Sequence, residues 1–226
     1  MKSALMNRQF ADQNKRTPPI SSRIYTLCLI LLLLAGCSNP TIEAQTEFPV
    51  PVMPKLDLNM GLLLDDDLTH FVHEESIEQM GDWHIEIGAA QKAMFSRLAE
   101  GMFRDSTLVE SLEASKGQVD AVLHPTIADF QFSTPQQTRS DYYEVWLKYN
   151  MELYDSEGQL VAEWPLTAYG KSNARNYGFM EKTREPALTE AIRVALRDAA
   201  AFFALKFARV REVADWLESR QEVAGS

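Results

Sequence analysis

Cysteine is scarce in this chain of 226 residues, and its only two copies, Cys28 and Cys37, lie near the N-terminus. The rest of the chain has no thiol. A disulfide framework, a cysteine metal site and a thiol nucleophile are therefore excluded from any domain that follows. Such a domain needs no cross-links, because 46% of the residues are hydrophobic and can build an ordinary core.

The hydrophobic run near the N-terminus is too short to span a membrane. It covers residues 24–34, whereas a transmembrane helix needs roughly 20 apolar residues. A secretory signal begins with basic residues, continues with a short apolar stretch and ends with small residues, and this chain shows the same order. We therefore predict a signal peptide over residues 1–36; a buried core helix and an N-terminal membrane anchor are the alternatives. The basic residues before the run are Lys2, Arg8, Lys15, Arg16 and Arg23.

Residues Leu34, Ala35, Gly36 and Cys37 resemble the bacterial lipobox, at which signal peptidase II cleaves before a lipidated cysteine. The resemblance implies a diacylglycerol and an acyl chain on Cys37, and we expect no other cofactor. Ser38 follows Cys37. In enterobacterial sorting, a Ser at this position allows transfer of the lipoprotein from the inner to the outer membrane. The resemblance thus implies a lipid anchor on the periplasmic face of the outer membrane. The inner membrane is the alternative, because sorting rules differ between bacteria.

Basic residues are outnumbered in the chain as a whole, with 22 Lys and Arg against 32 Asp and Glu. Without residues 1–36 the counts are 17 and 31, which gives a net charge of −14. An acidic body repels phosphate backbones and anionic headgroups. We therefore expect no nucleic-acid partner, and membrane contact through the acyl chains alone. Simple solubility in the periplasm would also account for this acidity.

Recognisable catalytic motifs are missing as well, and we expect a protein that is not an enzyme. The chain has no G-x-S-x-G elbow and no glycine-rich phosphate loop. The alternative is a metal-dependent enzyme. If residues 68–75 were helical, His70 and His73 would share a face, and a neighbouring acid could complete a zinc or manganese site. Neither H-E-x-x-H nor a calcium-binding loop is present, so a solvated loop is favoured here.

Composition divides the remaining chain into three parts. Residues 37–55 hold the lipidated cysteine and four prolines, and such a segment is typical of an extended tether. Residues 56–220 are predicted to form a single α+β periplasmic domain. Residues 221–226 are expected to fray.

Hydrophobic periodicity predicts the elements of this domain. Spacings of three and four indicate helices over 88–103, from 183 onward and over 210–217. Period-two alternation indicates strands, the last two joined as a hairpin by a turn at 155–158. The predicted fold is α+β, with a largely antiparallel sheet and two main helices packed on one face. The predicted strands cover residues 56–64, 83–87, 119–132, 142–154 and 159–171.

The hairpin also predicts a contact surface. If the Tyr143 face of its first strand is buried, Tyr142 and Trp146 look outward, and exposed large aromatics mark possible recognition surfaces. The alternative is that the tether or the C-terminal helix covers Trp146. The neighbouring loops add three more candidate contacts: Arg139, Tyr177 and Phe179.

The lipobox, the tether and the order helix, hairpin, Ala-rich helix are similar to the lipopolysaccharide-assembly lipoprotein and to the auxiliary lipoproteins of ABC-type lipid transport systems. The resemblance implies a non-enzymatic module that docks to a β-barrel, a substrate-binding component or a lipid. It covers residues 56–208 in element order only, and residues 65–82 form an extra stretch. We therefore expect an accessory subunit of an envelope assembly or lipid-transport system that binds a protein partner. A cell-wall-binding or synthase-regulating lipoprotein is the second hypothesis, and the metal-dependent enzyme is the third.

Overall fold

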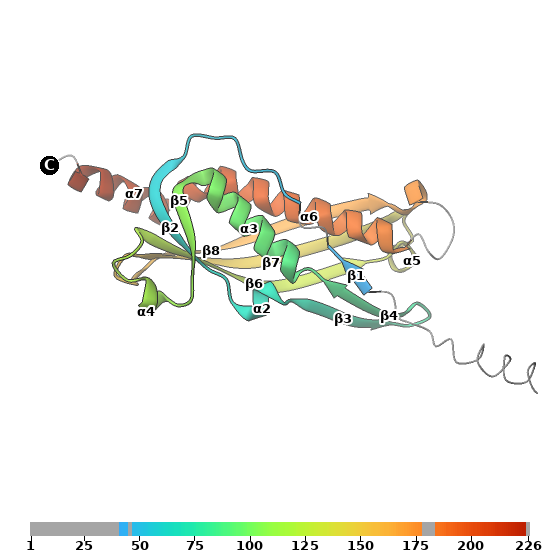
Figure 1. Cartoon of the computed structure of the whole chain (residues 1–226). Helices are drawn as coiled ribbons and strands as arrows, with labels where there is room; N and C mark the ends of the chain where they lie inside the picture. Colours follow the sequence, from blue (N-terminus) through green and yellow to red (C-terminus); the bar gives the residue numbers. More distant parts are fainter. Residues whose placement is uncertain (1–40, 45–46, 178–183, 225–226) are drawn as a thin grey trace, which may run out of the picture. The chain divides into compact units, whose positions relative to one another are not determined.

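The computed structural model describes residues 41–44, 47–177 and 184–224, all within one compact unit that starts at Asn39. The predicted signal peptide, Cys37 and Phe179 lie outside these residues. Within them the fold is α+β, as predicted (Figure 1).

The main sheet has five strands in the order β5-β2-β6-β7-β8. β2 runs parallel to both of its neighbours, whereas β6, β7 and β8 are antiparallel to one another. The predicted hairpin is β7–β8, and its register pairs Trp146 with Tyr169. The strands are β2 Leu56–Leu63, β5 Phe103–Val109, β6 Ala121–Ser133, β7 Tyr142–Asp155 and β8 Leu160–Asn173.

The structure adds a second, three-stranded sheet that the sequence pattern did not predict. It consists of β1 (Thr41–Glu43), β4 (Gly81–Glu86) and β3 (Val72–Ile77), in that order. Its inner side packs on the main sheet through Trp83. The centroid of the Trp83 ring lies 5.3 Å from that of Phe132 and 6.3 Å from that of Tyr143.

Two long helices, α3 (Gly88–Met102) and α6 (Arg184–Lys206), lie side by side over one face of the main sheet (Figure 1). Tyr149 of β7 anchors α3: its ring meets Phe95 edge-on at 5.4 Å, and its hydroxyl donates to Gln91 Oε1 at 2.7 Å. α6 lies so close to β8 that a Cβ on Gly170 would clash with the carbonyl oxygen of Ala191. The shorter helices are α2 Asp66–Thr69, α4 Leu112–Ser115, α5 Pro135–Thr138, η1 Ala174–Tyr177, η3 Phe207–Arg209 and α7 Arg211–Ala224.

Several predicted segments differ from the structure. The predicted tether contains β1, and Ile42 and Phe48 within it are 2% and 9% exposed, so its described part packs on the domain. The polar stretch over 65–82 forms α2 and the β3–β4 hairpin rather than a loop. α7 remains helical through residue 224, where fraying was predicted.

Among the described residues, no helix combines the length and hydropathy that crossing a bilayer requires.

Candidate functional site

The outward face of the β7–β8 hairpin carries a pair of exposed aromatic side chains. Strand alternation sends Tyr143, Val145 and Leu147 into the core at 2%, 0% and 1% exposure, so Glu144 and Trp146, which alternate with them, point outward. Trp146 is 41% exposed, as the alternation predicts. Tyr169, its register partner on β8, is 36% exposed, and the two ring centroids lie 5.3 Å apart.

Polar bonds fix the position of Tyr169. Its hydroxyl donates to Glu144 at 2.6 Å, and its backbone N–H donates to Asp198 of α6 at 3.0 Å. Partial burial and the bond to Glu144 raise the pKa of Tyr169 to about 12. Gln131 of β6 stands opposite Trp146 on the other side. The result is a pre-positioned aromatic pair with a carboxylate and an amide beside it, which we call the aromatic face (Gln131, Glu144, Trp146 and Tyr169).

The other predicted contact residues are only partly brought to this face. Tyr142 lies at its end, half-buried, with the Lys171 ammonium 5.0 Å from its ring centroid. Arg139 is exposed at the end of α5, in a left-handed conformation with φ of 53°. Tyr177 lines a different pocket, together with Glu43 and Arg193. The sequence reasoning missed Tyr169, although alternation along residues 159–171 would have placed it outward.

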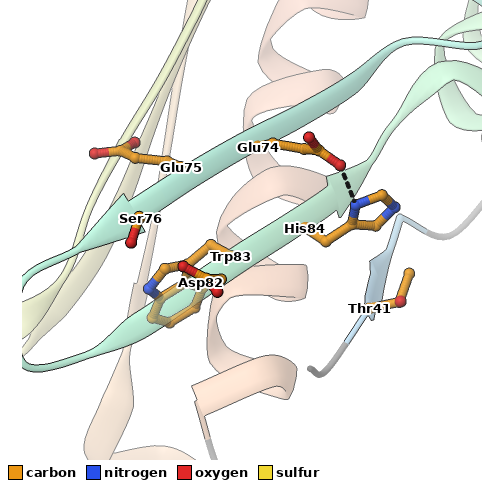
Figure 2. Close-up of a pocket in the computed structure, with 7 residues that line it drawn as sticks. All are labelled: Thr41, Glu74, Glu75, Ser76, Asp82, Trp83 and His84. Carbon is orange, nitrogen blue, oxygen red and sulfur yellow. Dashed lines mark hydrogen bonds and ion pairs between the residues drawn. The ribbon is translucent and has the colours of Figure 1, made fainter. Parts of the chain in front are cut away.

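A polar pocket of about 500 Å³ lies on the three-stranded sheet (Figure 2). Within it His84 is held between two carboxylates: Nδ1 is 3.0 Å from Glu74 and Nε2 is 3.0 Å from Glu86. The hydrogen bond to Glu86, followed by that to Glu74, raises the pKa of His84. Both ring nitrogens of His84 are thus engaged by carboxylates. The remaining lining residues are Thr41, Glu75, Ser76, Asp82 and Trp83, whose buried Nε1 has no hydrogen-bond partner within the described ranges.

His70 and His73 do not form the site that a shared helix face would have given. His70 follows the four-residue helix α2 and lies 3.4 Å from Asp66, whereas His73 belongs to strand β3. His73 Nε2 lies 3.1 Å from Glu75, and its ring packs 4.9 Å from Phe130. In the part of the chain that the structure describes, no three His, Cys, Asp or Glu residues are arranged to hold a metal ion.

A further histidine forms a network that no local motif signals. His124 of β6 lies 2.7 Å from Asp65 and 2.9 Å from Glu152 of β7. Glu152 also accepts a hydrogen bond from the Tyr154 hydroxyl at 2.9 Å. Burial, then the bond to Glu152, raises the pKa of Tyr154 to about 12. This half-buried network joins the end of β2 to β6 and β7. The contacts of His124 are therefore structural ones between these strands.

No protein-family profile matches the chain. No curated protein matches it either.

Several solved structures are similar to parts of this chain at low identity. A lipoprotein of Neisseria meningitidis, GNA1162, is 11% identical over 55% of this chain and 90% of its own, with a TM-score of 0.27. A candidate lipoprotein of Caulobacter crescentus is 14% identical over 44% of this chain and 67% of its own, with a TM-score of 0.33. A homologue of the neuraminyllactose-binding hemagglutinin from Helicobacter pylori is 9% identical over 80% of this chain and 99% of its own, with a TM-score of 0.46. Similarity at this level assigns the chain to no family.

Proposed function

We propose that the protein is a lipid-anchored, non-enzymatic accessory module of an envelope assembly or lipid-transport system. In this proposal Cys37 carries the lipid and fixes the chain to the periplasmic side of the outer membrane. The folded unit then binds a protein partner through the aromatic face. The role is positional: the anchor sets the location and the sheet provides the contact.

The observation that carries the proposal is the exposed pair Trp146 and Tyr169. Large aromatic side chains supply much of the binding energy at protein interfaces, and Trp and Tyr are enriched at their energetic centres. The bond from Tyr169 to Glu144 holds one ring in place before binding. A side chain that is already ordered loses less conformational entropy when a partner arrives.

Charges around the pair favour a partner with both signs on its surface. Lys148 lies next to the pair on β7, and its register partner on β6 is Asp129. Lys171 stands opposite Glu144 in the β7–β8 register. Mixed charges at the rim of an interface contribute orientation and specificity more than affinity.

Photocrosslinking in intact cells tests this proposal. A photoreactive amino acid at Thr167, which is exposed beside the pair, should capture one defined envelope protein. The matched control places it at Lys92, exposed on α3. Capture at Thr167 that disappears in Trp146→Ala supports the proposal. Equal capture at both positions, or none at Thr167, contradicts it.

The same face supports a second candidate function, binding of cell-wall glycan. Sugar rings stack on exposed aromatic side chains, and Glu144 and Gln131 stand beside the pair with groups that can bond hydroxyls. In a pull-down with purified peptidoglycan, retention of the wild type and loss of Trp146→Ala would favour this candidate. Absence of retention would leave the protein partner as the occupant.

A further inference from the structure

Residues 47–55 run across the outer side of α3 and α6 on their way to β2 (Figure 1). We call this segment the strap. Its Pro51 packs so tightly on the end of α3 that a Cβ at Gly101 would clash with it. The strap is therefore part of the packed domain, and its position is fixed relative to both helices.

An apolar groove of about 220 Å³ remains between the strap and the two helices. Its floor is formed by Met94 and Leu98 of α3, which are 1% and 3% exposed, and one wall is formed by Phe48. The opposite wall is α6, where the small side chains of Ala200 and Ala204 leave the space open. An apolar cavity does not bind water well and favours an apolar occupant.

The size of the groove restricts the occupant further. Pockets that enclose a whole small molecule usually measure about 300–1,000 Å³. At about 220 Å³ this groove is below that range, so it fits part of a slender chain rather than a ring system. An alkyl chain is the common biological group with that form.

One charge stands at the groove. Among the residues that the structure describes, Arg197 of α6 is the only charged one that lines the groove, and it lies one helical turn before Ala200 and Ala201. The nearby carboxylate of Glu190 is already bonded by Arg193, whose Nε donates to it at 2.6 Å. Within the described ranges, no carboxylate lies at ion-pair distance from Arg197. Its permanent positive charge complements an anionic headgroup at the end of an alkyl chain.

We infer that the groove binds one acyl chain of a free anionic amphiphile of the fatty-acid class, with its carboxylate at Arg197. This inference goes beyond the proposed function, because it concerns the helix side of the domain and not the aromatic face.

Titration with cis-parinaric acid, a fatty acid that becomes fluorescent in apolar sites, tests the inference. The titrated protein is the compact unit from Asn39 to Ser226, which contains the whole described core and lacks Cys37 and any lipid of its own. We expect saturable binding. The methyl ester of the same acid should bind about fivefold more weakly, because the ester has no charge for Arg197.

Two substitutions locate the site. Ala204→Leu fills the groove and should weaken binding about tenfold, whereas Ala208→Leu, exposed in η3 outside the groove, should not change it. Arg197→Gln should weaken binding of the acid to the level of the ester. Arg209→Gln removes an exposed cation elsewhere and should have no effect.

Three results would overturn the inference. They are the absence of saturable binding, equal affinity for acid and ester in the wild type, and equal effects of Ala204→Leu and Ala208→Leu. Circular dichroism on each variant separates loss of the site from loss of the fold. The outcome is independent of photocrosslinking at Thr167, because the two experiments report on different faces.

Discussion

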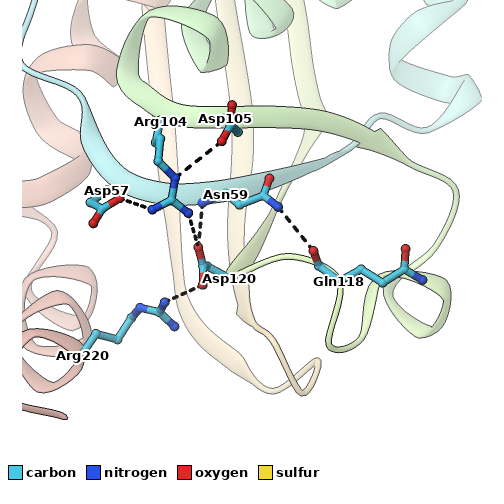
Figure 3. Close-up of polar contacts among 7 residues, drawn as sticks. All are labelled: Asp57, Asn59, Arg104, Asp105, Gln118, Asp120 and Arg220. Atoms are coloured by element: carbon cyan, nitrogen blue, oxygen red, sulfur yellow. Dashed lines mark hydrogen bonds and ion pairs between the residues drawn. The ribbon is translucent and has the colours of Figure 1, made fainter. Parts of the chain in front are cut away.

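Arg220 of α7 donates to Asp120 Oδ1 at 2.7 Å, and this bond links the last helix to the start of β6, one hundred residues earlier (Figure 3). The other oxygen of Asp120 accepts the backbone N–H of Asn59 at 2.7 Å. Arg104 of β5 lies 3.6 Å from the same carboxylate and also bonds Asp57. One carboxylate therefore ties together α7, β2, β5 and β6.

We expect Asp120→Asn to destabilise the protein by about 1–2 kcal/mol, because the partly buried Arg220 guanidinium would lose its charged acceptor. Urea unfolding followed by circular dichroism measures the change. Arg211→Ala is the control: its contact with Asp215 is 3.9 Å long and highly exposed, so its loss should cost little. Equal destabilisation by the two substitutions would contradict a structural role for the Asp120 network.

Acid should weaken the same network. Partial burial raises the pKa of Asp120, but the Asn59 N–H and the Arg220 guanidinium outweigh this effect and hold the pKa below its usual range. A lowered folded-state pKa gives stability that is present above the unfolded value of about 4 and is lost as pH falls through the folded value. The melting temperature of the wild type should therefore fall more steeply below pH ~4 than that of Asp120→Asn.

His84 predicts the opposite dependence. Its pKa is raised by Glu86 and Glu74, so the folded protein holds the imidazolium proton more tightly than the unfolded chain does. The stabilisation is complete below the unfolded-state pKa of about 6.5 and is lost as pH rises through the folded value. Above it, a neutral His84 leaves Glu74 of β3 and Asp82 and Glu86 of β4 on one face of the hairpin, with no positive partner among the described residues.

Melting curves taken from mildly acidic to alkaline pH should therefore show a loss of stability in the wild type that is reduced in His84→Gln. His70→Gln is the matched control, because His70 is largely exposed and lies on a different element. A profile of His84→Gln that runs parallel to that of the wild type would show that the Glu74–His84–Glu86 contact does not hold the proton.

Close packing of α6 on β8 gives a further prediction. Gly170→Ala would place a methyl group against the Ala191 carbonyl oxygen and the Ala195 backbone, so α6 would have to move. We expect a loss of about 3 kcal/mol. Gly117→Ala is the control, because it has φ of 68° and open space around it, and should cost only about 1 kcal/mol of backbone strain. Thermal unfolding of both variants separates packing from strain; equal losses would argue against tight packing at Gly170.

The local hydrophobic pattern was sufficient to predict an element where that element has one buried and one exposed face. The β7 strand shows strict alternation from Tyr143 to Leu153, and both its existence and the outward position of Trp146 followed from that pattern. Strand β5 has no such signal: five of its seven residues are exposed, so its sequence resembles a loop. Strand β3 places His73, which packs against Phe130, and Glu75 on its inner side, and a polar inner side hides the strand pattern.

Contacts between distant segments could not be predicted from a single sequence. Asp65, His124 and Glu152 are each ordinary polar residues, and only the order β2-β6-β7 brings them together. The strap has the proline content of a tether, and its burial depends on α3 and α6 lying side by side. Tyr169 is different, because the alternation of β8 already contains it and only the register with Trp146 required the structure.

The lipid anchor gives the last prediction. Cys37 precedes the compact unit that begins at Asn39, so Cys37→Ser removes the predicted lipidation site without touching a described contact of the fold. We expect the variant, expressed behind a signal that is cleaved without lipidation, to leave the membrane fraction while keeping the melting temperature of the compact unit. Ser38→Ala is the control, because it changes the neighbouring residue and keeps the cysteine. Cys37→Ser protein that stays in the membrane after an alkaline carbonate wash, with its signal removed, would show that something other than an acyl chain holds the protein there.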